Sequence, residues 1–123
     1  MKRISETEHD KIVRDAVDYL TMQGFLNIKA DLNGYVQPKK ITWTATGKGH
    51  IPDVTAQSSN LLIFEVETAD SISHAHTADQ WKLFSAYANQ HGATFWVVVP
   101  KGFDSDAHSR LNQLGIQAKI WEL

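Results

Sequence analysis

The stretch IPDVTAQSSNLLIFEVET, residues 51–68, predicts two neighbouring strands joined by a short polar loop, and the rest of the fold is built around them. The loop is the segment 58–60, Ser-Ser-Asn. With a loop of three residues, Gln57 pairs with Leu61 and the remaining pairs follow outward. A loop of two residues would shift the register by one and send every side chain of one strand to the opposite face. The predicted arrangement is thus an antiparallel hairpin whose register depends on an odd loop length.

Three acidic residues lie on this hairpin. Counting outward from the loop places Asp53 directly opposite Glu65, and strand alternation puts Glu67 on the same face, two residues along. Two carboxylates about 4 Å apart repel by ~4 kcal/mol at the effective dielectric near a protein surface. A proton or a hard cation such as Mg²⁺, which prefers oxygen ligands, would relieve this repulsion. The other interpretation is that acidic residues at exposed strand ends are simply solvated.

Outside the hairpin, hydrophobic periodicity predicts a single domain, residues 1–123, built from alternating helices and strands. We expect helices at 5–23, 77–91 and 105–114, and further strands within 25–32, around 40–45, at 93–100 and at 116–123. Capping-box spacings, Ser5 with Glu8 and Thr77 with Gln80, mark the first two helix starts. Apart from the short strand around 40–45, the order is helix, three strands, helix, strand, helix, strand. It predicts an α/β fold with a mixed central sheet, whose last two strands run parallel.

Composition limits the classes of function. The chain has 12 Lys plus Arg against 14 Asp plus Glu, a net charge of −2, so it lacks the overall basic character of many nucleic-acid-binding proteins. It has no cysteine, which excludes disulfides and thiolate chemistry. No apolar run approaches the roughly 18 residues that cross a bilayer, and the start of the chain lacks a signal-peptide pattern. We therefore expect a cytoplasmic protein with no membrane attachment, in which any nucleic-acid site is a local patch.

The segment 35–50, YVQPKKITWTATGKGH, is the candidate for such a patch because it contains no acidic residue. Its basic and aromatic candidates are Lys39, Lys40, Trp43, Lys48 and His50. Interleaved basic and aromatic side chains suit phosphate contacts and base stacking. A twisted hairpin with solvated lysines and Trp43 in the core is an equally compatible interpretation. His74 and His76 are further candidates, for contacts with phosphate, proton transfer or metal binding, or as residues of a loop surface.

The run IPDV, the short hairpin and IFEVET resemble the signature of the PD-(D/E)XK nuclease superfamily. That signature is Pro-Asp on one strand and Asp or Glu, any residue, Lys on the next. The expected order of elements from 5–23 to 93–100 is also similar to the core of that family. The resemblance implies a restriction-endonuclease-like fold and a Mg²⁺- or Mn²⁺-dependent nuclease that hydrolyses phosphodiester bonds, with DNA as the expected substrate. It implies Asp53 and Glu65 as metal ligands, assisted by the carbonyl of Val66.

The sequence departs from the family pattern at Glu67, which stands where the pattern has Lys. The resemblance gives Glu67 the role of orienting or deprotonating the attacking water, and Lys82 that of supplying the missing positive charge. Glu8 matches a glutamate that many members carry in the first helix, and Gln80 matches a glutamine that several branches place near the site. Each has a structural alternative: helix capping for Glu8 and Gln80, and a solvated charge for Lys82.

Two other functions are compatible with these residues. One is a catalytically inactive module of the same fold that binds nucleic acid or a protein partner. The other is a metal-dependent hydrolase of a different phosphorylated substrate. For a duplex substrate, a homodimer would let a domain this small reach both strands.

Overall fold

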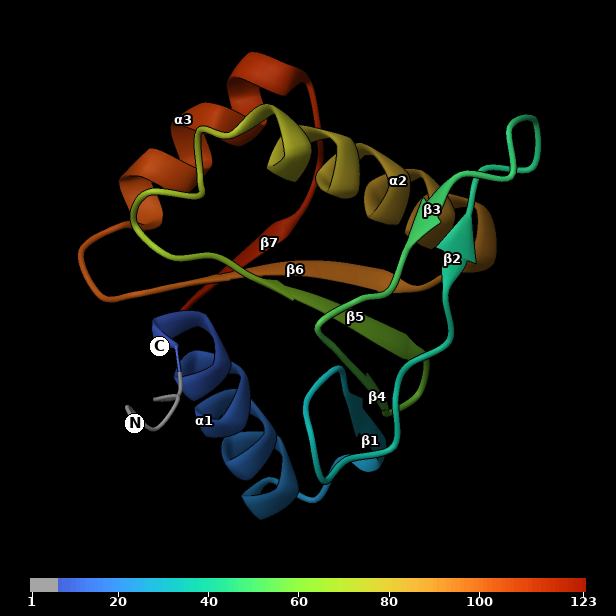
Figure 1. Cartoon of the computed structure of the whole chain (residues 1–123), viewed down its shortest axis with the longest axis vertical. Coiled ribbons are helices and arrows are strands. Elements are labelled where there is room, and N and C mark those ends of the chain that lie inside the picture. Colours follow the sequence, from blue (N-terminus) through green and yellow to red (C-terminus); the bar gives the residue numbers. More distant parts are fainter. Residues whose placement is uncertain (1–6) are drawn as a thin grey trace, which may run out of the picture.

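The computed structural model describes residues 7–123 and contains three helices and seven strands (Figure 1). The helices are α1 (Glu8–Met22), α2 (Ala75–His91) and α3 (Asp104–Leu114). The strands are β1 (Leu26–Ala30), β2 (Ile41–Thr42), β3 (Gly49–His50), β4 (Val54–Gln57), β5 (Leu61–Val66), β6 (Thr94–Val99) and β7 (Lys119–Glu122). Within this described part, no helix is long and apolar enough to cross a membrane.

Five strands form a mixed central sheet in the order β1-β4-β5-β6-β7. β4 runs antiparallel to both of its neighbours, β1 and β5, whereas β5, β6 and β7 run parallel. The predicted α/β fold, with its helix, three strands, helix, strand, helix, strand order in the central sheet, is therefore confirmed. The strand expected around 40–45 is a partial exception. Only Ile41–Thr42 is extended, and it pairs with β3 in a separate two-stranded sheet that packs against α2.

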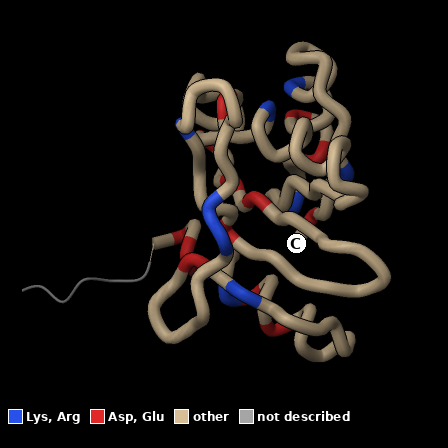
Figure 2. Tube along the Cα trace, turned by 90° about the vertical axis from the view of Figure 1, so that its right-hand side faces the viewer, with Lys and Arg blue, Asp and Glu red and all other residues tan. Residues whose placement is uncertain are grey.

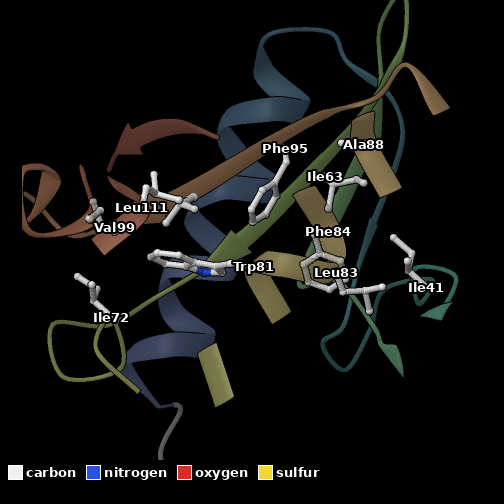
Figure 3. Packing of buried hydrophobic residues seen from close by; sticks show 12 residues of the cluster. Ile41, Ile63, Ile72, Trp81, Leu83, Phe84, Ala88, Phe95, Val99 and Leu111 are labelled. Atoms are coloured by element: carbon white, nitrogen blue, oxygen red, sulfur yellow. The ribbon is translucent and has the colours of Figure 1, made fainter. Parts of the chain in front are cut away.

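Helices cover the two faces of the central sheet. Figure 1 shows α1 on one side of the sheet, and α2 and α3 on the other. Alternation along β5 follows this division, because Ile63 belongs to the core on the α2 side whereas Phe64 and Val66 belong to the core on the α1 side. Figure 3 shows the first of these cores, in which Trp81 and Phe84 pack between α2 and the sheet.

Strand β6 has apolar neighbours on both faces, as its uninterrupted apolar sequence predicts. Val97 and Val99 belong to the core on the α2 side, and Val98 belongs to the core on the α1 side. All three side chains are fully buried. A continuous apolar run, rather than an alternating one, is the pattern expected of a strand in this position.

The helix starts differ from those predicted. Thr7 caps α1, with its Oγ1 accepting the Asp10 N–H at 3.1 Å, while the predicted cap Ser5 lies outside the described residues. Helix α2 begins at Ala75, two residues earlier than expected, and its N-cap His74 makes no side-chain capping bond. The predicted capping box of Thr77 with Gln80 is therefore wrong, because Thr77 already lies inside the first turn of the helix.

Candidate active site

The β4–β5 hairpin has the register that the sequence predicts. Gln57 pairs with Leu61 across the three-residue loop, and each further pair follows in step. Asp53 directly precedes β4, so continuing the register by one residue places it opposite Glu65. An odd loop length therefore brings these two carboxyl groups to one face at the open end of the hairpin.

Hydrogen bonds join Asp53 and Glu65 through the backbone. The Asp53 N–H donates to Glu65 Oε1 at 3.1 Å, and the Val66 N–H donates to Asp53 Oδ2 at 2.7 Å. Only 9% of Asp53 and 2% of Glu65 is exposed. With the neighbouring Glu67, which is 3% exposed, they form a buried group that we call the acidic cluster.

The acidic cluster changes the protonation of Glu65. Burial raises the pKa of Glu65 well above its ordinary value, and repulsion from Asp53 and Glu67 raises it further. The hydrogen bond from the Asp53 backbone acts in the opposite direction but is the smaller influence. Glu65 is thus the most buried member of the cluster, and both burial and its acidic neighbours favour its protonated form. A proton held by Glu65 would be released if the two opposed carboxyl groups took up a cation.

Glu67 is tied to α2 and to the loop that precedes it. The Trp81 indole N–H donates to Glu67 Oε2 at 3.0 Å, while the hydroxyls of Ser71 and Thr77 donate to Oε1 at 2.6 and 3.5 Å. Burial raises the pKa of Glu67 to about 7, although the bonds from Ser71 and Trp81 lower it. Because both carboxyl oxygens already accept hydrogen bonds, this geometry favours a role in positioning α2 over direct contact with an attacking water.

His9 of α1 brings a positive charge to the acidic cluster. Its Nε2 lies 3.1 Å from Asp53 Oδ2, and its Nδ1 lies 3.2 Å from Asp10 Oδ1. The hydrogen bond to Asp53 raises the pKa of His9 to about 9, and partial burial offsets only part of this rise. The imidazole is therefore protonated at neutral pH. It provides a cation next to Asp53 in a sequence that lacks the lysine of the family pattern.

His9, and not Glu8, lies on the sheet-facing side of α1. The buried positions of this helix are Val13, Ala16, Val17 and Leu20. His9 precedes Val13 by four residues and so lies on the same stripe, whereas Glu8 is exposed. Glu8 has the spacing of Ile12, which packs on the core of the α1 side, and of the buried Ala16, but its own side chain at the start of the helix is exposed. Spacing measured from Val13 is the sequence signal that identifies His9.

Neither Lys82 nor Gln80 joins the acidic cluster. Lys82 is exposed on α2 and lines a groove between this helix and the segment 114–119. Gln80 is partly buried, and within residues 7–123 it forms no hydrogen bond with the cluster. The side chain of α2 that does reach Glu67 most closely is Trp81, which periodicity alone assigns only to the core.

The residues of the basic and aromatic segment separate in space. Lys39 and Lys40 line a pocket on the α2 side of the sheet. Trp43 and Lys48 flank the turn between β2 and β3, where the Trp43 N–H donates to the Lys48 carbonyl at 2.8 Å. Trp43 is 41% exposed, so the alternative that it packs into the core is wrong. Figure 2 shows lysines and arginines on several separate parts of the chain trace.

The histidine candidates lie at the other end of the small sheet. His50 in β3 packs edge-on against His76, with ring centroids 5.2 Å apart, and against Phe84 at 6.3 Å. Burial lowers the pKa of His50, and the nearby His76 lowers it further. His74 is exposed at the start of α2. These side chains are close enough to form a small aromatic surface at the start of α2.

The donor set of the acidic cluster fits a hard divalent cation only in part. Asp53 and Glu65 present opposed carboxyl groups, and Mg²⁺ commonly binds one or two protein carboxylates while it keeps several waters. However, Asp53 Oδ2 already interacts with Val66 and His9, and both oxygens of Glu67 are engaged. No three His, Asp or Glu side chains of residues 7–123 are arranged to hold a metal. Asp53 and Glu65 are thus the residues that would hold such an ion, while the role expected of the Val66 carbonyl stays a prediction.

The fold and this site together define an α/β protein with a buried carboxyl pair at the open end of a central hairpin. Neither a scan against protein-family models nor a search of curated proteins finds a match. A solved structure described as "Structure of EndoMS-dsDNA2 complex" is similar with a TM-score of 0.45 and 14% sequence identity. The match covers 98% of this chain and 47% of that one, so this chain spans about half the length of the protein it resembles. The functional proposal therefore depends on the residues of this chain.

Proposed function

We propose that this chain is a metal-dependent nuclease-like phosphodiesterase that acts on nucleic acid, with DNA as the substrate. The observation that supports the proposal is the pair of opposed, buried carboxyl groups of Asp53 and Glu65. Two opposed carboxyl groups are costly to bury, because burial disfavours their ionised form and their charges repel each other. A divalent cation, Mg²⁺ or Mn²⁺, would remove that cost by binding both groups in their ionised form.

The side chains around the pair have separate roles in this proposal. When bound, the metal ion would activate a water molecule and neutralise charge on the phosphodiester. His9 supplies a positive charge beside Asp53, where it would favour the approach of a phosphate group. Glu67 holds α2 against the end of β5 through Trp81, and so keeps the pair enclosed.

Cleavage assays test this proposal directly. Plasmid and single-stranded DNA are incubated with Mg²⁺ or Mn²⁺ and with the wild type, Glu65→Gln or Asp18→Asn. The Gln side chain of Glu65→Gln still accepts the Asp53 N–H but does not bind metal as a carboxylate. Asp18→Asn is the matched control because it makes the same chemical change at an exposed position of α1. We expect cleavage by the wild type and the control, and none by Glu65→Gln. Equal cleavage by all three proteins would point to a contaminant or another site and would refute the proposal.

One observation favours a second function, that of a nucleic-acid-binding module without catalysis. Glu67 replaces the lysine of the family pattern, accepts hydrogen bonds at both oxygens and is only 3% exposed, which leaves little access for an attacking water molecule. In this case labelled DNA would bind in the presence and in the absence of a divalent ion, and neither strand would be cleaved. The cleavage assay therefore separates the two functions.

A further inference from the structure

A basic pocket of about 400 Å³ lies on the same face of the sheet as the acidic cluster. It is enclosed by the C-terminal part of α2, the edge of the sheet at β1 and β4, and the segment that leads into β2. The polar side chains that matter here are Lys29, Lys39, Lys40, Thr55, Tyr87 and His91. Within the described part of the chain, no Asp or Glu lines this pocket.

The three lysines of the pocket are not neutralised by ion pairs. Among residues 7–123, the ion pairs are His9 with Asp10 and Asp53, and Lys11 with Asp15. Like charges around one hollow repel each other, and an anion placed between them would relieve that repulsion. The pocket therefore has the charge of a phosphate site, in the same way that the acidic cluster has the charge of a cation site.

The pocket and the acidic cluster are close neighbours. Lys29 of β1 pairs with Thr55 of β4, so that both belong to one row across the sheet. Thr55 lies two residues after Asp53, which directly precedes the same strand, and continued alternation puts both side chains on one face about 7 Å apart. Neighbouring phosphates of a single nucleic-acid strand could therefore occupy the pocket and approach the acidic cluster together.

A stacked pair of aromatic rings also lines the pocket. Tyr87 and His91 are one helical turn apart on α2, and their rings are stacked with centroids 4.1 Å apart and planes inclined by 28°. Bases of single-stranded nucleic acids stack on such rings in a sequence-tolerant way. Positive charge, hydroxyl groups and stacked aromatic rings together match the chemistry of a nucleotide.

We propose that this pocket binds a nucleotide phosphate of the substrate strand, next to the phosphodiester that lies at the acidic cluster. This inference rests on the proposed function for its substrate, but the binding can be measured without any cleavage. The phosphate can come from a strand end or from the interior of a strand. The chemistry that the pocket recognises is the same in both cases.

Binding of a labelled single-stranded 12-mer in EDTA tests this inference by fluorescence anisotropy. The variants are Lys40→Gln and the double change Lys29→Gln with Lys40→Gln, compared with Lys101→Gln as an exposed control outside the pocket. We expect the double variant to bind about 10-fold more weakly at low salt. Loss of one phosphate contact should also reduce the slope of log K against log salt by about 0.7. The control should match the wild type in affinity and in salt slope.

Two arms of the experiment identify the source of the phosphate. A 5′-phosphorylated strand and the same strand with a 5′-hydroxyl are bound to each protein. A preference of the wild type for the phosphorylated strand that disappears in the double variant identifies a strand end. An equal loss for both strands identifies an internal phosphate, and both results support the pocket.

The result of the binding experiment can be distinguished from the result of the cleavage assay. If the double variant binds like the wild type at every salt concentration, while cleavage is lost in Glu65→Gln, the pocket inference is wrong and the proposed function stands. If binding depends on the lysines but no protein cleaves DNA, the pocket stands and the proposed catalysis is wrong.

Discussion

Replacing Glu67 with Gln should stabilise the metal-free protein at neutral and alkaline pH. Folding raises the pKa of Glu67 from 4.5 to about 7 because the carboxyl group is buried. The stability contributed by the protonated group is fully present below pH 4.5 and is lost as the pH rises through about 7. Between a pH below 4.5 and a pH above 7, this rise in pKa lowers the free energy of unfolding by about 3.4 kcal/mol. A glutamine at this position does not ionise and avoids that loss.

The surroundings of Glu67 can accept this substitution. The glutamine oxygen can accept the Trp81 indole N–H, and its NH₂ group can donate to the hydroxyls of Ser71 and Thr77, which can also act as acceptors. A neutral amide accepts a weaker hydrogen bond than a carboxylate, which offsets part of the gain. We therefore expect Glu67→Gln to be more stable than the wild type by about 1–3 kcal/mol at pH 8 and nearly equal to it at pH 4.5.

Urea unfolding in EDTA, followed by tryptophan fluorescence between pH 4.5 and 8.5, measures this difference. Asp18→Asn is the control because it removes an exposed carboxyl group from the same protein. Because this carboxyl group is exposed, its removal should change the free energy of unfolding by less than about 0.5 kcal/mol. If Glu67→Gln is less stable than the wild type by the same amount at pH 4.5 and pH 8, Glu67 is ionised throughout and the reasoning is refuted.

Two further variants test other parts of the structure. His9→Gln should be less stable than the wild type by about 1 kcal/mol at pH 6, a value reduced by solvent screening because the ring is 37% exposed. Protonated His9 contributes to the free energy of unfolding fully below pH 6.5, and this contribution is lost as the pH rises through about 9. The urea midpoints of His9→Gln and the wild type should therefore converge at pH 10. A difference in urea midpoint that is the same at pH 6 and pH 10 would contradict the ion pair of His9 with Asp53. Gly49→Ala should disrupt the pairing of β2 with β3, because an added Cβ would clash with the backbone carbonyl oxygen of Ile41. Hydrogen exchange should then lose protection at β2 and β3 alone, and unchanged protection there would count against the described hairpin.

The hairpin that carries the carboxyl pair could be predicted because its determinants are local. Side-chain direction in a strand has a period of two, so the three-residue loop alone decides that Asp53 and Glu65 share a face. Strand β6 could be predicted for a similar reason, since an uninterrupted apolar run has few other places in an α/β fold. The register of the hairpin and the burial of β6 are thus each determined by residues within or directly next to these strands.

The parts that sequence reasoning missed depend on contacts between distant segments. His9 reaches Asp53 because the packing of the buried face of α1 against the sheet sets the rotation of this helix. Thr77 has the spacing of a capping residue, but its hydroxyl points to Glu67, which is ten residues away on another element. Trp81 looks like an ordinary core residue until Glu67 is placed opposite its N–H.

The strand expected around 40–45 is present only as β2, and its pairing with β3 in a separate sheet was beyond local reasoning. Each has two residues, too few for a period to be recognised, and their sheet packs against α2. The segment around them therefore takes its shape from tertiary contacts. As a result, the basic and aromatic residues predicted as one patch divide between a pocket, an exposed turn and a histidine pair.

Titration calorimetry with Mn²⁺ tests the central claim, that Asp53 and Glu65 form a site for a divalent cation. The account predicts that the wild type binds Mn²⁺ at millimolar concentrations or below. It also predicts that Glu65 releases its proton on binding, which makes the measured heat depend on the ionisation enthalpy of the buffer. Asp53→Asn and Glu65→Gln should bind no Mn²⁺ in this range, while Asp18→Asn should bind as the wild type does. Absence of binding by the wild type, or equal binding by Glu65→Gln, would contradict the claim.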